Sequence, residues 1–166
     1  MPAGRFRIIT LCVWALAAGV TAAGAQTATA TLAADVQPLG KLTLSATSLT
    51  FPDADPDLVP QVPAAGGPLT ITAKGRAHWG TVITLTVQAD DDLRSGVTVI
   101  PASTLSWTAS GTGFVDGTLN RTTAAVVASW SSPGVHGGTQ QWSFANSWLQ
   151  PAGTYTLTLL YTLTAP

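Results

Sequence analysis

The C-terminal stretch GTYTLTLLYTLTAP (residues 153–166) carries the clearest structural signal in the chain. Large apolar side chains alternate with threonine over residues 155–163, and Leu160 is the one break on the threonine side. A period of two is typical of a β-strand with one packed face and one solvated face. Because such a strand cannot bury its apolar face alone, the pattern predicts further strands that cover it.

Shorter runs of the same kind precede this stretch and are separated by clusters of Gly, Pro and Ser. Turn signals at short intervals between strand-length runs indicate an all-β protein. Glutamate is absent, so the residue types that usually cover helix surfaces are scarce. The pattern predicts an immunoglobulin-like antiparallel β-sandwich of about seven to nine strands. The expected strands lie at residues 41–45 with a continuation at 48–51, then at 69–74, 81–88, 97–100, 105–109, 124–130, 140–144 and 155–163, and the main loops at 52–68, 110–117 and 131–138.

The N-terminal residues have the features of an export signal. Arg5 and Arg7 precede an apolar run at residues 8–20, and Ala23-Gly24-Ala25 fits the small-residue rule for cleavage. We expect a signal peptide at residues 1–25, a Thr/Ala-rich lead-in or first strand at 26–38, and the β-sandwich domain at 39–166. The apolar run is short for a membrane span. The expected product is exported to the periplasm, cell surface or medium, without a stable membrane span in its mature form.

The composition of residues 26–166 limits the partners of the expected mature protein. Five basic residues stand against eight aspartates, which gives a formal charge of −3. This balance predicts no basic patch for nucleic acid or anionic lipid. The one cysteine, Cys12, lies in the expected signal peptide, so the fold should be held without disulfides.

Tryptophan supports two different expectations. Trp107, Trp130 and Trp142 are in phase with neighbouring apolar residues, which favours core positions. Trp79 and Trp148 lie beside loops, where exposure is expected. Exposed aromatic rings stack on sugars, so Trp79, Trp148 and Trp130 are the candidate platform of a carbohydrate-binding module.

The sequence contains no recognisable catalytic set. Hydrolase chemistry of the Ser-His-Asp kind needs a positioned base, and only His78 and His136 are available. No Gly-x-Ser-x-Gly motif accompanies them, and His136 lies in a glycine-rich stretch expected to be a turn. We therefore expect a protein that is not an enzyme and needs no cofactor.

One acidic cluster is a candidate for calcium. Asp53, Asp55 and Asp57 are spaced two residues apart in a proline-rich stretch, and calcium favours oxygen-rich flexible loops. Leu58 and Ala64 stand where a calcium loop has its glycine and its distal glutamate. The alternative is that these aspartates cap turns and keep strand ends soluble.

The two ends of the chain resemble secreted bacterial immunoglobulin-like subunits, most closely spore coat U and Csu-type pilin domains. The resemblance rests on the export signal, the domain size, and Pro151-Ala-Gly153-Thr-Tyr155 followed by an alternating last strand. The chain differs from those pilins by lacking their cysteines and by the inserted Ala152. The resemblance implies assembly by donor-strand pairing, with the segment at 26–34 as the donor.

These observations together predict a non-catalytic exported structural or adhesive subunit of a bacterial surface or extracellular assembly, pilus-like or matrix-like. Its partner would be another protein or a second copy, bound through edge strands. Leu160 is the residue expected to face that partner. The alternative is the secreted carbohydrate-binding module.

Overall fold

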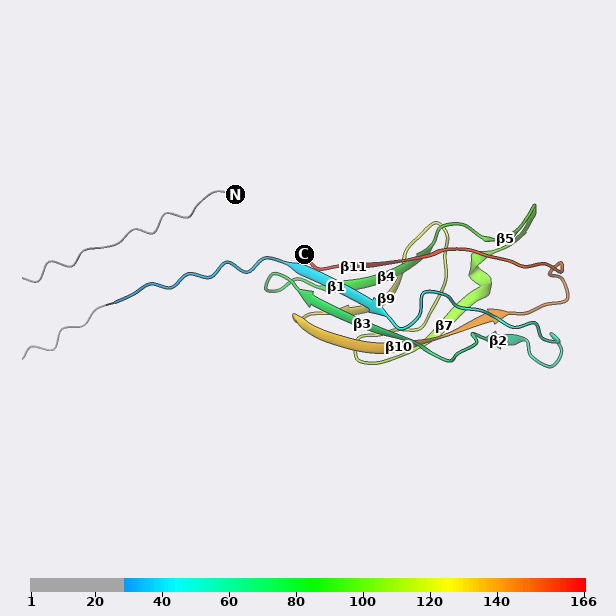
Figure 1. Cartoon of the computed structure of the whole chain (residues 1–166), viewed down its shortest axis with the longest axis horizontal. Coiled ribbons are helices and arrows are strands. Elements are labelled where there is room, and N and C mark those ends of the chain that lie inside the picture. The colour runs from blue at the N-terminus through cyan, green and yellow to red at the C-terminus, as the bar shows by residue number, and fades with distance from the viewer. Residues whose placement is uncertain (1–28) are drawn as a thin grey trace, which may run out of the picture. The chain divides into compact units, whose positions relative to one another are not determined.

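The computed structural model describes residues 29–166, of which residues 35–166 form one compact unit (Figure 1). Residues 29–34 belong to a separate N-terminal unit. These six residues contain no strand, and each of their side chains is exposed. The expected signal peptide at residues 1–25 lies outside the described residues.

The larger sheet is antiparallel and has six strands in the order β1-β3-β10-β7-β8, with β2 also paired to β10. No α-helix occurs within residues 29–166, where one short 3-10 turn at Ala102–Thr104 precedes β7. The all-β prediction is therefore confirmed. The strands of this sheet are β1 (Leu39–Leu44), β2 (Gln61–Pro63), β3 (Leu69–Arg76), β7 (Leu105–Ser110), β8 (Gly117–Thr118) and β10 (Gly134–Ala145).

The second sheet is also antiparallel and has three strands in the order β11-β4-β9. Its strands are β4 (Ile83–Ala89), β9 (Ala125–Trp130) and β11 (Leu159–Thr164). A separate hairpin joins β5 (Leu93–Ser95) to β6 (Thr98–Ile100). Figure 1 shows β11 and β4 running together along one side of the unit, and β3 and β10 along the other. The count of strands exceeds the predicted seven to nine because β2, β5, β6 and β8 have only two or three residues each.

Both sheets contribute to one hydrophobic core. Ile71 and Ala73 of β3 are fully buried, as are Leu85 and Val87 of β4. Their neighbours in sequence are exposed or half-buried, which is the period-two pattern that the sequence predicts. Burial of these alternating side chains is the main favourable term that holds the two sheets together.

Two tryptophans fill the centre of this core. Trp107 of β7 and Trp142 of β10 are register partners, and their ring centroids lie 4.9 Å apart at a tilted angle. Trp107 donates its indole N–H to the carbonyl oxygen of Val115 at 2.9 Å. Both rings are buried, as the sequence pattern predicts. Gly117 leaves room for the Trp107 ring, because a Cβ on Gly117 would overlap the ring atoms.

A buried polar contact connects the two sheets. Tyr161 of β11 donates its hydroxyl to the Gln140 side-chain oxygen of β10 at 2.6 Å. Gln140 is fully buried, and burial raises the pKa of Tyr161, so the hydroxyl stays a donor at physiological pH. A one-residue slip of β11 would turn Tyr161 outward and leave this buried amide without its partner. The contact therefore specifies the register of the last strand.

The last strand begins later than predicted. Regular pairing with β4 starts at Leu159, whereas the sequence pattern predicts a strand from residue 155. The reason is that β4 ends at Ala89, and the chain then turns through residues 90–92. The preceding residues of the last stretch meet this turn instead: Thr158 exchanges hydrogen bonds with Asp90, and Thr156 forms an isolated bridge with Arg94. The alternation of exposed and half-buried side chains continues across the whole stretch.

Three further predictions are wrong in position. The expected loop at residues 52–68 contains β2, which pairs with β10. Residues 131–138 were expected to be a loop, but β10 begins at Gly134 and pairs with β3 there. Gly138 serves close packing rather than a turn, because a Cβ at this position would lie 2.5 Å from the Phe114 ring. Residues 48–51, expected to continue the first strand, form no strand. Leu49 and Phe51 are nevertheless half-buried against the core.

Candidate functional site

The three tryptophans proposed as a sugar platform do not lie together. Trp130 is only 6% exposed and stacks on His136 at 4.5 Å, so its assignment to an exposed platform is wrong. Trp79 and Trp148 are 99% and 69% exposed. Trp79 follows β3 and Trp148 follows β10, and these antiparallel neighbours end at opposite ends of the sheet. The exposed rings therefore cannot form one coplanar platform.

The two histidines also lie apart from any catalytic arrangement. His78 is exposed in the β3–β4 connection, and its backbone N–H donates to the carbonyl oxygen of Pro166 at 2.9 Å. His136 lies on β10 rather than in the expected turn, with its ring against Trp130 and Nε2 3.1 Å from the Ser132 carbonyl oxygen. Among residues 29–166, neither ring has a hydrogen bond to an aspartate or serine side chain.

The candidate calcium residues lie in the connection between β1 and β2. The Asp55 carboxylate accepts the backbone N–H of Asp57 at 2.9 Å, which is the turn-capping role considered as the alternative. The Asp57 carboxylate accepts the indole N–H of Trp148 at 3.1 Å. Within the described part of the chain, no three acidic, histidine or cysteine side chains are arranged to hold a metal ion.

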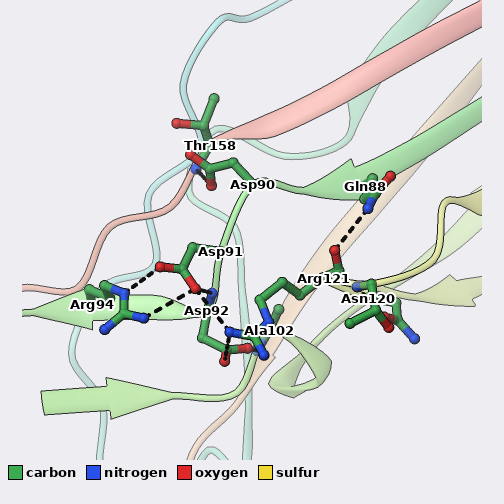
Figure 2. A network of polar contacts seen from close by, with 10 residues as sticks. Gln88, Asp90, Asp91, Asp92, Arg94, Ala102, Asn120, Arg121 and Thr158 are labelled. Atoms are coloured by element: carbon green, nitrogen blue, oxygen red, sulfur yellow. Dashed lines mark hydrogen bonds and ion pairs between the residues drawn. The ribbon is translucent and has the colours of Figure 1, made fainter.

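A second acidic cluster at the end of β4 is organised by two arginines (Figure 2). Asp91 forms an ion pair with Arg94, and Arg121 contacts Asp91 at 3.2 Å and Asp92 at 3.4 Å. The Asp92 carboxylate accepts the backbone N–H of Ala102 at 2.9 Å. These contacts fasten the β5–β6 hairpin and the loop before β9 to the end of β4. The carboxylates are occupied by arginine and backbone donors, which indicates a structural role.

This network predicts an acid-dependent loss of stability. The Arg94 hydrogen bond and the Asp92 backbone N–H hold the pKa of Asp91 well below its ordinary value of 3.8. Because the folded-state pKa is depressed, the stabilisation is present above that ordinary value and is lost as the pH falls below it. We expect the Tm difference between the wild type and Asp91→Asn to shrink as the pH is lowered from about 6 to about 2.

Thermal melts at several pH values test this expectation. Asp53→Asn is the control for the loss of a charge alone, because it removes an exposed carboxylate that has no arginine contact, and at pH 6 it should lower the Tm by less than Asp91→Asn does. A Tm difference for Asp91→Asn that is constant across the same range would contradict the assignment.

On one side of the unit, the edge strands β1 and β11 of the two sheets lie next to each other. Each of these strands is the last of its sheet, and no ladder joins them within residues 35–166. They approach where a Cβ on Gly40 would lie 3.4 Å from the Leu163 side chain. The apolar side chains along this side are only half-buried, although they face the core. We call this set the β1/β11 seam: Leu42, Leu44, Leu49, Phe51, Tyr155, Leu157, Leu159, Tyr161 and Leu163.

The opposite side of the core is closed by backbone hydrogen bonds. Residues 113–115, which lead from β7 to β8 in the larger sheet, run beside β9 of the smaller sheet. Val115 donates its N–H to Val127 at 2.9 Å, and Ser129 donates to Gly113 at 3.0 Å. Phe114 packs edge-on against Trp130 with ring centroids 5.5 Å apart. The unit is therefore sealed at one side and has two unpaired strand edges at the other.

Leu160 lies on β11 with its side chain pointing away from the core. It is 62% exposed, and its register partner on β4 is Gln88. The strand that carries Leu160 is also the free edge of its sheet. This position is compatible with the partner-facing role expected from the sequence, which no contact in the described structure tests.

The structure also brings together three basic residues that are distant in the sequence. Lys41 of β1 is the direct register partner of Lys74 of β3, and Arg76 lies two residues further along β3. All three side chains are exposed and line a surface hollow over Gly75 and Gly134. Total charge does not reveal this cluster, because strand pairing unites residues that are 33 to 35 positions apart in the chain. A prediction that β1 pairs with β3 would have found the cluster.

Comparisons with known proteins add no relative: no family model matches, and no match is found among the curated proteins or the solved structures. Among residues 29–166, no helix has the length and hydropathy needed to cross a bilayer.

Proposed function

We propose that this chain is a non-catalytic exported structural subunit of a bacterial surface or extracellular assembly, built on an immunoglobulin-like β-sandwich. Its copies would join by adding an extended segment of one subunit to the open edges of the next. The observation that carries this proposal is the β1/β11 seam, where unpaired strand edges coincide with half-buried apolar side chains.

An added strand would pair the free backbone groups of the two edges and would also cover the apolar side chains of the seam. Unpaired edge N–H and C=O groups form a template for a further strand, and natural proteins usually blunt or cover such edges. Covering the seam would also remove apolar area from water, at roughly 25 cal/mol per Å². On the opposite side, residues 113–115 already form backbone hydrogen bonds with β9. An incoming strand is therefore expected to bind at the seam.

The N-terminal segment at residues 26–34 is the proposed donor. Its described part from residue 29 to residue 34 forms no strand and exposes every side chain, including Leu32. A segment without strand pairing of its own is free to pair with another chain, and the main-chain hydrogen bonds supply affinity even where side chains are small. Threonine at positions 27, 29 and 31 suits an extended conformation.

A synthetic peptide of residues 26–34 tests the proposal when it is added to the purified chain. We expect amide hydrogen exchange in residues 159–164, in residues 39–44 or in both to slow by about tenfold or more, because paired edges are protected. The matched control is the same peptide with proline at Thr29 and Thr31, which removes two backbone donors without adding charge.

Self-assembly of the chain is the complementary measurement. Size-exclusion chromatography with light scattering and negative-stain microscopy should show oligomers or fibres. Unchanged exchange with the wild-type peptide, or equal protection by the proline peptide, would exclude the proposed strand addition.

A further inference from the structure

Three of the five basic residues in residues 26–166 lie together on the outer face of the larger sheet. Lys41 and Lys74 are direct cross-strand partners, and like charges in that position destabilise a sheet. Within residues 29–166, the ion pairs involve only Arg94 and Arg121, so neither lysine is neutralised by a carboxylate there. The side chain of Arg76 donates to the backbone carbonyl oxygen of Gln37 at 2.7 Å, and it has no ion pair among the described residues either. We call Lys41, Lys74 and Arg76 the basic end of the unit. Their mutual repulsion lowers the stability of the isolated domain and is not offset by an ion pair among the described residues.

The other end of the same unit carries the opposite charge. Asp53, Asp55 and Asp57 are exposed in the β1–β2 connection, and none of them has an ion pair in the described residues. The Asn146 side chain, just beyond the end of β10, donates to the Ala54 carbonyl oxygen at 2.9 Å and fixes the location of this loop. Asp90, Asp91 and Asp92, whose charge is partly neutralised by arginine, directly follow β4 and lie at this acidic end as well.

The distance between the two ends determines whether their charges can attract each other within one molecule. β10 begins beside Gly75 of β3, at the basic end, and its 12 residues run to the acidic end, a length of about 40 Å. The Debye length in physiological salt is about 8 Å, so the two clusters hardly attract each other within one molecule. Favourable pairing of these charges therefore requires a second molecule.

Exposed apolar side chains accompany the charges at both ends. Leu39 and Val135 flank the lysines of the basic end. Leu58, Trp148 and Leu149 accompany the aspartates of the acidic end, where Trp148 is hydrogen-bonded to Asp57. Apolar residues surrounded by charged residues are typical of a protein interaction surface.

We propose that the basic end of one copy docks onto the acidic end of a second copy, in a head-to-tail contact. Lys41, Lys74 and Arg76 face Asp53, Asp55 and Asp57 of the neighbouring molecule, with the exposed apolar residues between them. Because each copy has one end of each kind, the contact is heterologous and repeats along a chain of copies. The charges give this contact its direction. This interface is separate from the β1/β11 seam and does not depend on strand addition.

A charge-swap experiment with the full chain tests the contact. One variant carries Lys41→Glu and Lys74→Glu, and the other carries Asp53→Lys and Asp57→Lys, which leaves the Asp55 turn bond intact. Each variant has two ends of the same sign, so each alone should lose self-association by about tenfold or more at about 20 mM NaCl, measured by sedimentation velocity. An equimolar mixture of the two variants should regain it, because unlike ends then meet.

Three controls make the result decisive. Circular dichroism and thermal melts establish that the variants are folded, which is expected since all four side chains are exposed. Thr108→Glu adds negative charge in the middle of the outer face and should leave association unchanged. Wild-type association should weaken by about tenfold when NaCl is raised from about 20 to about 500 mM.

The remaining outcomes overturn the contact. They are a wild type that stays monomeric at low salt, variants that associate like the wild type, or a mixture without rescue. A monomer that binds heparin through Lys41 and Lys74 would identify a polyanion as the partner instead of a second copy. None of these outcomes decides the peptide experiment at the seam, which tests strand addition separately.

Discussion

Replacing Trp107 by alanine is expected to lower the free energy of unfolding by about 4 kcal/mol, with a fall in Tm of about 15 °C. The ring is buried against Trp142 in the centre of the core, so its removal leaves a cavity that the two sheets cannot fill. The substitution also removes the indole donor from the Val115 carbonyl oxygen. Denaturant unfolding followed by circular dichroism measures the loss.

Trp79→Ala is the matched control for this experiment. It makes the same chemical change at a side chain that is almost fully exposed in the β3–β4 connection. Its effect should stay within about 0.5 kcal/mol. If the two variants lost similar stability, the inward assignment of Trp107 would be wrong.

Replacing Gly113 by alanine is expected to cost about 3 kcal/mol. Gly113 has a φ of +84°, a region that residues with a Cβ rarely adopt. An added Cβ would also lie 2.5 Å from the Ser129 carbonyl oxygen and 2.7 Å from the Trp130 indole nitrogen. The clash falls where residues 113–115 close one side of the core, so β9 should lose protection from amide exchange before the rest of its sheet.

Gly80→Ala separates backbone strain from steric overlap as causes of this loss of stability. Gly80 has a similar φ of +79°, but no atom lies within 4 Å of the position where its Cβ would be built. This variant should therefore show only the backbone strain, about 1 kcal/mol. Equal losses for the two variants would mean that the close approach of residues 113–115 to β9 is not needed for stability.

Much of the fold follows from local alternation of apolar and polar residues. The runs around Leu85 and Ile71 contain β4 and β3, because a strand with one buried face needs an apolar residue at every second position. Trp107 and Trp142 are buried for the same reason. One error falls where a glycine has a packing role: Gly138 indicates a turn in the sequence, but in the structure it makes room for Phe114 inside β10.

Less of the candidate site could be predicted from the sequence. The prediction that Leu160 faces outward depends only on strand phase and agrees with its exposure. The prediction that Trp130 could stack on a sugar is wrong, whereas the core position favoured by strand phase is correct, with Phe114 and His136 packed against the ring. The β1/β11 seam and the basic end both depend on which strands become neighbours.

The amino-acid sequence by itself determined the strand character of this protein and the residues that face its core, since both follow from a period of two that any local window contains. Only the tertiary structure decided that β1 and β11 are left as free edges and that Lys41 meets Lys74. The physical reason is that strand order and register are set by the packing of all the strands against one core, so that residues far apart in the chain become neighbours only after folding.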